Sequence, residues 1–259
     1  MIPAAQGFRT IERATVVSNQ RVGDKIFITR FLSPEVSSSV NPGQFVMVSF
    51  PDCLDPLLAR AFSVSDAHEK ILSLLYASVG KGTTRLSKLE KGDVVVINGP
   101  LGTGFPELSK GEKVWVVVGG SGAALVPILY RDARRSKAEI KIFYGARTRR
   151  QLVNFKGIEV NFATDDGSRG YHGTVIKLVD KHLAKEKPDK IFGCGPTPML
   201  VKLQEKANGG FEVFISVETP MACGMGFCQG CPVKIKDAPD YFLACKNGPV
   251  FEAKEIELE

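Results

Sequence analysis

Four cysteines in the C-terminal part of this 259-residue chain constrain its fold more than any other feature. Their spacing is C-x4-C-x2-C, and thirteen residues separate the third cysteine from the fourth. Spacings this short place three thiols in one tight loop, which has to wrap around a small centre. Glycine tolerates the left-handed backbone conformations and close approaches that such wrapping needs, and this loop contains Gly224, Gly226 and Gly230.

The spacing is typical of plant-type ferredoxins, in which four thiolates hold a [2Fe–2S] cluster. A structural zinc site prefers two C-x2-C pairs, and a disulfide framework suits small secreted chains. This chain has one C-x2-C pair, and residues 1–14 lack the apolar core of a signal peptide. Cys53 and Cys194 stand apart from the group. The pattern therefore predicts one-electron transfer by a [2Fe–2S] cluster on Cys223, Cys228, Cys231 and Cys245.

Composition and charge place the chain among ordinary globular proteins. Its apolar share of 44% and charged share of 24% are those of a soluble chain. The sequence contains no run of eighteen apolar residues, which is the length that would indicate a membrane span. The net charge of +6 is spread along the chain without an aromatic-rich basic stripe. We expect a cytoplasmic protein of two or three domains with no nucleic-acid or membrane partner.

The first hundred residues have the pattern of an all-β domain. Runs rich in Val, Ile, Leu and Phe alternate with Gly, Pro and Asn turns about every ten residues, which predicts a small antiparallel barrel. The predicted strands are residues 12–19, 25–32, 44–50, 71–78 and 93–98. One short helix is predicted over residues 82–90.

Two short segments of this domain together suggest flavin binding. One reads Arg-Ala-Phe-Ser from Arg60 to Ser63, and the other reads Gly-Lys-Gly-Thr-Thr from Gly80 to Thr84. Arginine offers a fixed fork of donors to a phosphate, and a glycine-rich turn into a helix offers backbone N–H groups to a second one. The Ser63 hydroxyl could donate to a flavin ring. Taken singly, these segments also occur as a surface arginine and an ordinary turn.

The pattern changes after Glu112 to that of a doubly wound α/β domain. Residues 114–118 form an unbroken apolar run, as expected of a strand that is buried on both faces of a parallel sheet. Strands and helices then alternate. The further predicted strands are residues 139–144, 158–163 and 189–193, and the predicted helices are residues 123–135, 173–186 and 197–207.

Two glycine-rich turns follow predicted strands of this domain. One is Gly-Gly-Ser-Gly and the other is Gly-Cys-Gly-Pro. Neither is the G-x-G-x-x-G fingerprint, and a tight turn without a ligand is the alternative. Ligands bind such sheets at the carboxyl ends of the strands, so the turns predict a nucleotide site. Its residues would be Gly119, Gly120, Ser121, Gly122, Gly193, Cys194, Gly195 and Pro196.

The order of these motifs resembles the ferredoxin–NADP reductase superfamily along nearly the whole chain. Within it, the cluster segments Met-Ala-Cys-Gly-Met-Gly-Phe-Cys (221–228) and Ala-Cys-Lys-Asn-Gly-Pro-Val-Phe (244–251) are most similar to the electron-transfer subunit of NAD-dependent (class 1B) dihydroorotate dehydrogenase. Two positions depart from the superfamily's pattern. Ala61 stands where proline is frequent, and the nucleotide turn has lost a glycine and reaches Pro127 with a different spacing.

The resemblance implies three parts and three cofactors. Residues 1–105 would form an FAD-binding β-barrel, residues 106–210 an NAD-binding α/β domain and residues 211–259 a [2Fe–2S] domain. NAD(H) would bind the two glycine-rich turns. FAD would bind Arg60, Ala61, Phe62, Ser63, Leu75, Tyr76, Ala77, Gly82, Thr83 and Thr84.

The resemblance also implies an oxidoreductase subunit of pyrimidine biosynthesis. A separate FMN-type catalytic subunit would oxidise dihydroorotate within a heterotetramer, and its electrons would pass through the cluster and FAD to NAD+. This chain would bind no dihydroorotate and needs no catalytic acid or base. We therefore interpret its three histidines, His68, His172 and His182, as surface or structural residues.

Several alternatives remain open at this level. Asp165 and Asp166 favour NAD by repelling a 2′-phosphate, whereas Arg147, Arg149 and Arg150 could attract one. A related reductase subunit of sulfhydrogenase or ferredoxin–NADP transhydrogenase type would share this layout, although the latter typically has Asp as its first cluster ligand. A zinc-stabilised binding module is the third hypothesis.

Overall fold

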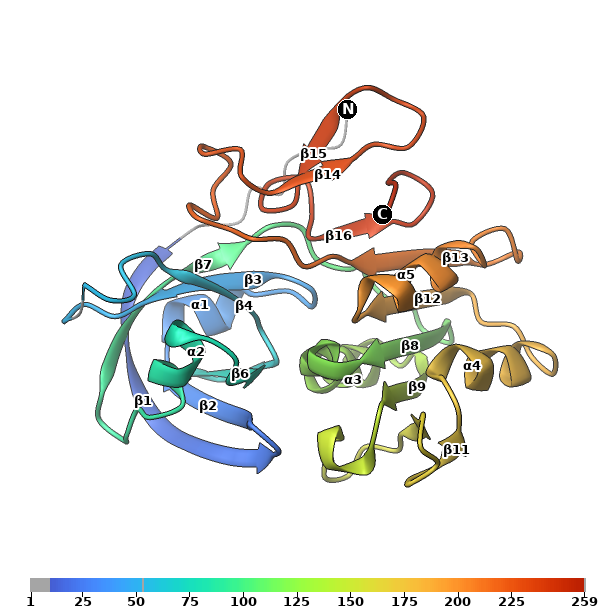
Figure 1. Ribbon diagram of the computed structural model, residues 1–259, viewed down its shortest axis with the longest axis horizontal. Coiled ribbons are helices and arrows are strands. Elements are labelled where there is room, and N and C mark those ends of the chain that lie inside the picture. The colour runs from blue at the N-terminus through green and yellow to red at the C-terminus, as the bar shows by residue number, and fades with distance from the viewer. Residues whose placement is uncertain (1–9, 53, 259) are drawn as a thin grey trace.

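The computed structural model describes residues 10–52 and 54–258, so Cys53 lies outside the described residues. A seven-stranded antiparallel barrel-like sheet lies beside a seven-stranded α/β sheet, and a small C-terminal hairpin lies above both (Figure 1). This arrangement confirms the predicted fold class. None of the helices in these residues has the length and apolar character that a membrane span requires.

The barrel-like sheet contains the five predicted strands and two short strands that were not predicted. Its order is β4-β3-β7-β1-β2-β6-β5. The strands are β1 (Thr10–Gly23), β2 (Ile26–Leu32), β3 (Phe45–Ser49), β4 (Arg60–Ser63), β5 (Asp66–His68), β6 (Ile71–Ala77) and β7 (Val94–Leu101). Helix α1 (Pro34–Ser39) was also not predicted, and the helix predicted over 82–90 is the shorter α2 (Lys81–Leu86).

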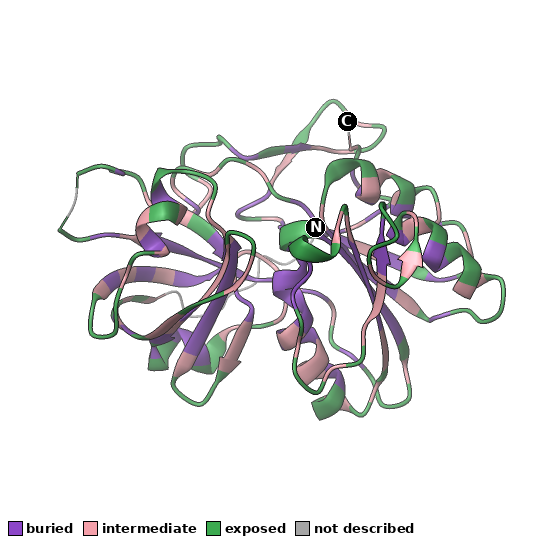
Figure 2. Ribbon diagram, turned by 60° about the horizontal axis from the view of Figure 1, so that its bottom comes forward, coloured by how far each residue is buried: buried purple, intermediate pink, exposed green. Residues whose placement is uncertain are grey.

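Strand β6 lies between two cores, which explains why every one of its seven residues except Ser73 is apolar. Leu72, Leu74 and Tyr76 point into the barrel core, whereas Leu75 packs in the cluster that fills one side of the α/β sheet. Alternate side chains of a strand point to opposite faces. Both faces of β6 are therefore buried, and Leu75 joins the barrel to the α/β part. Buried segments run through the interior of both parts (Figure 2).

The α/β sheet has the order β11-β10-β9-β8-β12-β13-β16, with only β16 antiparallel to its neighbour among these described strands. The strands are β8 (Lys113–Gly119), β9 (Glu139–Ala146), β10 (Asn161–Thr164), β11 (Tyr171–His172), β12 (Lys190–Cys194), β13 (Glu212–Ser216) and β16 (Val250–Glu252). The helices are α3 (Val126–Ser136), α4 (Val175–Leu183) and α5 (Thr197–Gln204), and two 3₁₀ turns are η1 (Gly120–Leu125) and η2 (Arg149–Gln151).

The order of strands reverses between β8 and β12. From β8 the chain moves outward through β9 and β10, and it then returns to place β12 on the other side of β8. Such a reversal leaves a crevice at the carboxyl ends of the strands, where ligands of open α/β sheets bind. Both predicted glycine-rich turns begin at this point.

The C-terminal hairpin consists of β14 (Pro232–Lys234) and β15 (Tyr241–Leu243). It shares one apolar cluster with both larger parts, since that cluster contains Val233 of β14, Ile215 of β13 and Met47 of β3. Strands β13 and β16 lie beyond residue 210 and still pair within the α/β sheet. The predicted division into 1–105, 106–210 and 211–259 stays a prediction, with the third part joined to the second through these two strands.

Candidate functional site

The two segments predicted to bind flavin come together at one end of the barrel. A Cβ atom added to Gly82 would lie 2.8 Å from Cγ of Arg60, so the arginine side chain lies directly against the first turn of α2. Nη1 of Arg60 donates to the carbonyl oxygens of Leu58 at 2.7 Å and Ala59 at 3.3 Å. Only glycine leaves room for this approach, which positions a cation beside the turn.

The turn before α2 is held by the hydroxyl of Thr83. Its Oγ1 accepts hydrogen bonds from the backbone N–H of Val79 at 2.9 Å and of Gly80 at 3.0 Å, and it donates to the Gly80 carbonyl. The Thr84 hydroxyl lies 3.3 Å from that of Ser78. These bonds fix the loop shape that a phosphate would meet.

The aromatic residues among the predicted flavin ligands belong to the barrel core. Tyr76 is only 4% exposed, its hydroxyl lies 3.0 Å from Oγ1 of Thr29, and its ring packs edge-on against Phe62 at 5.5 Å. Burial raises the pKa of Tyr76 to about 12. Since Phe62 of β4 points into this core, and alternate side chains of a strand point to opposite faces, its neighbours Ala61 and Ser63 lie on the outer face of the sheet.

The two glycine-rich turns of the α/β sheet touch each other at the reversal of strand order. A Cβ atom on Gly122 would run into the carbonyl group of Cys194, and one on Gly119 would lie 2.9 Å from Cδ of Pro196. Gly120 has φ +54°, a left-handed conformation that favours glycine. The backbones of the two turns therefore pack directly against each other. The crevice is open because the glycines at these positions have no side chains to fill it.

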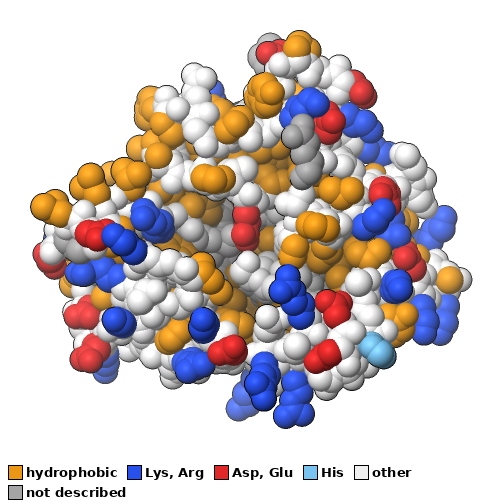
Figure 3. All heavy atoms as spheres, in the orientation of Figure 1, with side chains coloured by type: hydrophobic (Ala, Val, Ile, Leu, Met, Phe, Trp, Pro, Cys, Tyr) orange, Lys and Arg blue, Asp and Glu red, His pale blue; other side chains and the backbone are white. Residues whose placement is uncertain are grey.

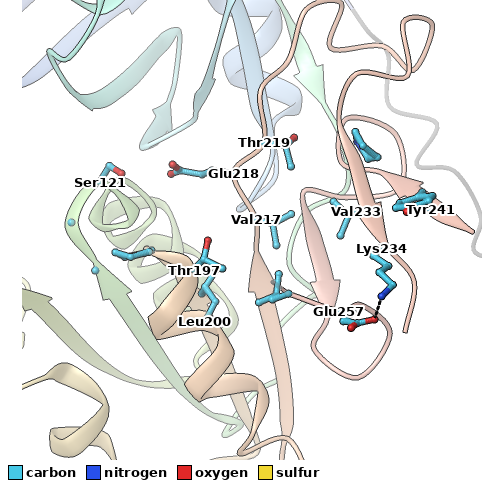
Figure 4. A pocket seen from close by; sticks show the side chains of 16 residues that line it. Ser121, Thr197, Leu200, Val217, Glu218, Thr219, Val233, Lys234, Tyr241 and Glu257 are labelled. Atoms are coloured by element: carbon cyan, nitrogen blue, oxygen red, sulfur yellow. Dashed lines mark ion pairs between the residues drawn. The ribbon is translucent and has the colours of Figure 1, made fainter. Parts of the chain in front are cut away.

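A cavity of about 720 Å³ opens at these turns (Figure 4). The turns and α5 form one wall, and the C-terminal hairpin with the last residues of the chain forms the other. Its lining includes Gly119, Gly120, Ser121, Gly195, Pro196, Thr197, Glu218, Thr219, Lys234, Tyr241 and Glu257. Lys234 and Glu257 form an ion pair at 2.7 Å.

The sequence analysis missed Glu218, a charged residue that follows β13 at the edge of the sheet and lines the cavity. Its carboxylate and the Ser121 hydroxyl point toward each other across the crevice (Figure 4) and share a hydrogen bond. The surrounding protein atoms raise the pKa of Glu218, and the bond from Ser121 opposes that rise. Its place directly after a parallel strand was the available signal.

Cys194 of the Gly-Cys-Gly-Pro turn is a buried group rather than an exposed contact. Its side chain is 2% exposed, and burial, with a smaller contribution from Glu218, raises the pKa of its thiol. Of the predicted nucleotide residues, Gly119, Gly122, Gly193 and Cys194 are buried, Gly195 is half-buried, and Gly120, Ser121 and Pro196 are exposed. Gly122, Gly193 and Cys194 shape the turns, and the other five line the cavity.

Loops after β9 and β10 lie at the other end of the same sheet edge. Oδ1 of Asp166 accepts hydrogen bonds from the backbone and hydroxyl of Ser168, at 3.0 and 2.6 Å, which lower the pKa of Asp166. The Ser168 hydroxyl in turn accepts from the backbone N–H of Arg149 at 2.8 Å. Hydrogen bonds through Ser168 thus connect Asp166 with Arg149, two of the residues predicted to select between NAD and NADP.

The four cysteines lie in two pairs. Sγ of Cys231 and Sγ of Cys245 are 3.2 Å apart and buried. Sγ of Cys223 accepts hydrogen bonds from the backbone N–H of Met225 at 3.4 Å and of Cys228 at 3.5 Å, and these bonds lower its pKa to about 6. Among the described residues, no three His, Cys, Asp or Glu side chains form a single-ion site. Two pairs of thiols suit the two irons of a [2Fe–2S] cluster.

The loop that carries three of these cysteines rests on the barrel (Figure 1). We call residues 221–231 the cluster loop. A Cβ atom on Gly224 would lie 2.6 Å from Cγ of Met47 in β3, and Nδ2 of Asn98 in β7 lies 3.5 Å from Sδ of Met225. Met47 is paired with Ala61 on one side and with Asn98 on the other. The predicted flavin segment is therefore one strand away from the cluster loop.

None of the three histidines lines the cavity, although the ring of His172 lies against Gly167 of the loop after β10. His68 and His172 are exposed. His182 packs edge-on against Phe143 at 5.0 Å, and burial together with the charge of Lys141 lowers its pKa.

Comparisons with known proteins agree on one family. A family model described as the iron–sulfur cluster binding domain of dihydroorotate dehydrogenase B matches residues 218–257. The electron transfer subunit of dihydroorotate dehydrogenase B (NAD(+)) from Caldanaerobacter subterraneus subsp. tengcongensis is 38% identical over 252 residues, which cover 94% of this chain and 97% of that protein. The subunit of the same name from Clostridium acetobutylicum is 37% identical over 255 residues, 96% and 97% of the two chains.

Solved structures agree on the fold. A chain of the NADH-dependent reduced ferredoxin–NADP oxidoreductase, described for flavin-based electron bifurcation, superposes with a TM-score of 0.84 at 27% identity, covering 95% of this chain and 90% of that one. The ferredoxin reductase of carbazole 1,9a-dioxygenase has a TM-score of 0.67 at 23% identity and covers 78% and 67%. The second likeness concerns the fold alone.

Proposed function

This chain belongs to the family of electron-transfer subunits of dihydroorotate dehydrogenase B, and we propose that it carries electrons from a catalytic dihydroorotate dehydrogenase subunit to NAD+. It is an oxidoreductase subunit of pyrimidine biosynthesis. Its cofactors are FAD, a [2Fe–2S] cluster and NAD(H), and its partner is the catalytic subunit.

One observation carries the proposal: three candidate sites meet at the junction of the three parts. The cluster loop lies on Met47 and Asn98, and Ala61 of the predicted flavin segment is the next residue across the sheet from Met47. The nucleotide crevice opens beside Glu218, five residues before the first cluster cysteine. Electrons that enter at the thiolates would pass from the cluster loop across Met47 to the predicted flavin segment.

The three cofactors have complementary chemistry, because nicotinamide exchanges two electrons as a hydride, the cluster exchanges one electron, and a flavin connects the two regimes. The protein has to hold them and keep them apart from solvent. Arg60 and the turn at Gly82 supply cationic and backbone donors for the flavin phosphates. Ala61 and Ser63, on the outer face of β4, offer backbone and hydroxyl groups to the ring.

The nucleotide would lie along the carboxyl edge of the α/β sheet. Its phosphates would meet the turn at Gly120 and Ser121, where backbone N–H groups precede a helix. Its nicotinamide would lie at Gly195 and Pro196 beside Glu218. The adenosine ribose would reach Asp166, whose low pKa keeps it anionic and favours a 2′-hydroxyl over a 2′-phosphate.

Four thiolates from the two pairs would hold the cluster. Cys223 and Cys228 form the outer pair on the cluster loop, and Cys231 and Cys245 form the buried pair. Backbone N–H groups that already point at Sγ of Cys223 stabilise its thiolate. We assign the protein to the cytoplasm, as the biosynthetic role and the reduced thiols suggest.

A second candidate follows from the likeness to the ferredoxin–NADP oxidoreductase chain. A subunit of that type would share the flavin and nucleotide sites and differ in its partner. The cysteine at position 223, where that type typically has Asp, favours the dihydroorotate partner.

The proposal is tested by the visible spectrum of the anaerobically purified chain, with iron and flavin quantified before and after NADH is added. We expect one FAD and about two irons per chain, and bleaching of both chromophores by NADH. A protein that stays colourless after cluster reconstitution with FAD would sink the electron-transfer function. Bleaching by NADH without electron exchange with a dihydroorotate dehydrogenase catalytic subunit would point to the second candidate.

A further inference from the structure

Three leucines are exposed on the connection between β3 and β4. Leu54 is 85% exposed, Leu57 is 73% exposed and Leu58 is 54% exposed. Exposed apolar groups of this kind that lie together mark interaction sites more often than they occur by chance. Figure 3 shows apolar side chains along the upper left of the molecule, over the barrel and the unit above it.

The cluster loop exposes a large apolar side chain as well. Phe227 lies between the first two cluster cysteines and is 81% exposed, and its neighbour Cys228 is exposed too. The outer pair of thiols is therefore the part of the cluster site that another protein can approach. An electron donor has to cover this side if electrons are to reach the cluster.

The connection between β3 and β4 that carries the three leucines, called here the leucine connection, packs against the same apolar cluster as the cluster loop. Ala59, which ends the leucine connection, packs in the same apolar cluster as Met225 of the cluster loop and Met47 of β3. An ion pair between Lys81 and Asp55 at 2.8 Å holds the connection against the start of α2. The exposed leucines thus lead directly into β4, whose Ala61 pairs with Met47, the residue that Gly224 of the cluster loop packs against.

The leucines differ from another exposed apolar residue that belongs with the flavin segment. Val79 is 84% exposed, but its backbone N–H donates to Thr83 within the predicted flavin turn. The leucines precede Arg60, whose guanidinium is turned back onto the carbonyl of Leu58. Val79 therefore belongs to the predicted flavin turn, and the three leucines form a separate group.

We propose that Leu54, Leu57 and Leu58 form, with Phe227, the surface onto which the catalytic dihydroorotate dehydrogenase subunit docks. This inference rests on the proposed function, because it takes that subunit as the electron donor. The partner would cover the leucines with an apolar patch of its own while its flavin faces the outer thiols. Apolar anchors at the centre of an interface carry most of its affinity, so the leucines would set the strength of the complex.

The test compares the double variant Leu54→Ser/Leu57→Ser with the wild-type chain, both loaded with FAD and cluster. Binding to the catalytic subunit is measured by titration calorimetry, and sedimentation follows the complex. We expect binding about tenfold weaker or worse, with flavin content, iron content and bleaching by NADH at wild-type values. Leu32→Ser is the matched control, since Leu32 is 45% exposed on β2, separated from β3 by β7 and β1, and should bind like the wild type.

Three results would overturn the proposal. Wild-type affinity in the double variant would show that the leucines are not in the interface. Loss of FAD would assign them to the flavin site instead. A change in self-association of the chain alone would assign them to a contact between two copies. Failure of the wild-type chain to be bleached by NADH is a separate result, which contradicts the proposed function itself.

Discussion

The nucleotide crevice and the cluster loop are built in opposite ways. The crevice lies between regular strands, and its turns touch through backbone, with Gly122 against Cys194 and Gly119 against Pro196. The cluster loop contains no helix or strand among its described residues, and Gly224, Gly226 and Gln229 all have positive φ. The protein alone defines the first site, whereas the second depends on what its thiols bind.

The two sites should therefore respond differently to change. A site defined by backbone contacts is sensitive to added volume, because close-packed atoms have nowhere to move. A loop whose thiols converge on a cluster is sensitive to loss of a ligand, since metal binding and local folding are coupled. Each of the following variants is designed to affect one site and spare the other.

The largest effect is expected for Cys231→Ser, which removes a thiol of the buried pair. The cluster should be lost, and electron transfer with the catalytic subunit should fall by about 100-fold or more, because the cluster is the carrier that links the FAD to that subunit. NADH should still bleach the FAD. Iron analysis and stopped-flow spectra at the flavin band check both halves.

Cys194→Ala is the control for that variant. Cys194 is also buried but belongs to the Gly-Cys-Gly-Pro turn behind the nucleotide crevice, so iron content should stay at the wild-type value. If Cys194→Ala lost iron as well, the two regions would not be independent and the comparison would fail.

Gly122→Ala should affect the crevice in the complementary way. A Cβ atom at this position meets the backbone of Cys194, which is not free to move, and overpacking of this kind costs roughly 1–3 kcal/mol. We expect a lower melting temperature and a KM for NADH raised about tenfold, with a full complement of iron. Unchanged KM together with unchanged stability would mean that the two turns are able to separate.

The parts predicted from the sequence are those with a local signal. The cysteine spacing, the strand pattern of the barrel and the apolar run from Val114 to Val118 each lie within a few residues. Strand β13 gives a weaker signal, with three consecutive apolar residues between Glu212 and Ser216, so residue 210 was taken as a boundary although β13 pairs with β12 in the same sheet. Glu218 belongs to no motif and gains its place from that pairing.

The contact between the cluster loop and the barrel could not be predicted, because it joins residues that are far apart in the chain. Met225 contacts Asn98 across 127 positions of the chain. Neither residue type points to such a contact, and only the fold brings the two together. The order of motifs implied that flavin and cluster belong to one protein but not which strands separate them.

Met225→Ala tests how much the contact between Met225 and the barrel contributes to the position of the cluster loop. Removal of a half-buried methionine leaves a partly open space and should cost about 1–2 kcal/mol locally. We expect slower reduction of the cluster after NADH is mixed with the protein, by about threefold to tenfold, at an unchanged rate of flavin bleaching. Met225→Leu, which keeps the volume, should restore most of the rate. Equal slowing of both phases would show that the variant disturbs the barrel rather than this contact.

The smallest effect is expected for Ser121→Gly, which restores a glycine that the superfamily usually has in this turn. The Ser121 hydroxyl lowers the pKa of Glu218, so its loss should raise that pKa further above the ordinary value. Protonation of Glu218 removes a negative charge beside an incoming anionic nucleotide. Affinity for NADH should therefore increase as pH falls through this pKa, by about fivefold, since two unit charges about 4 Å apart interact by about 1 kcal/mol in a water-like medium.

In the Ser121→Gly variant the increase should begin at a higher pH than in the wild type. Other charged groups of the cavity should not reproduce the shift, because Lys234 and Glu257 neutralise each other as an ion pair and burial keeps the Cys194 thiol protonated. Glu218→Gln should flatten the profile in both backgrounds. Titration of NADH binding across pH decides the matter: a profile that keeps its midpoint in Ser121→Gly would mean that the serine does not set the ionisation of Glu218. The binding properties of the crevice would then depend on its backbone contacts alone. The crevice would differ even more from the cluster loop, which depends on what its thiols bind.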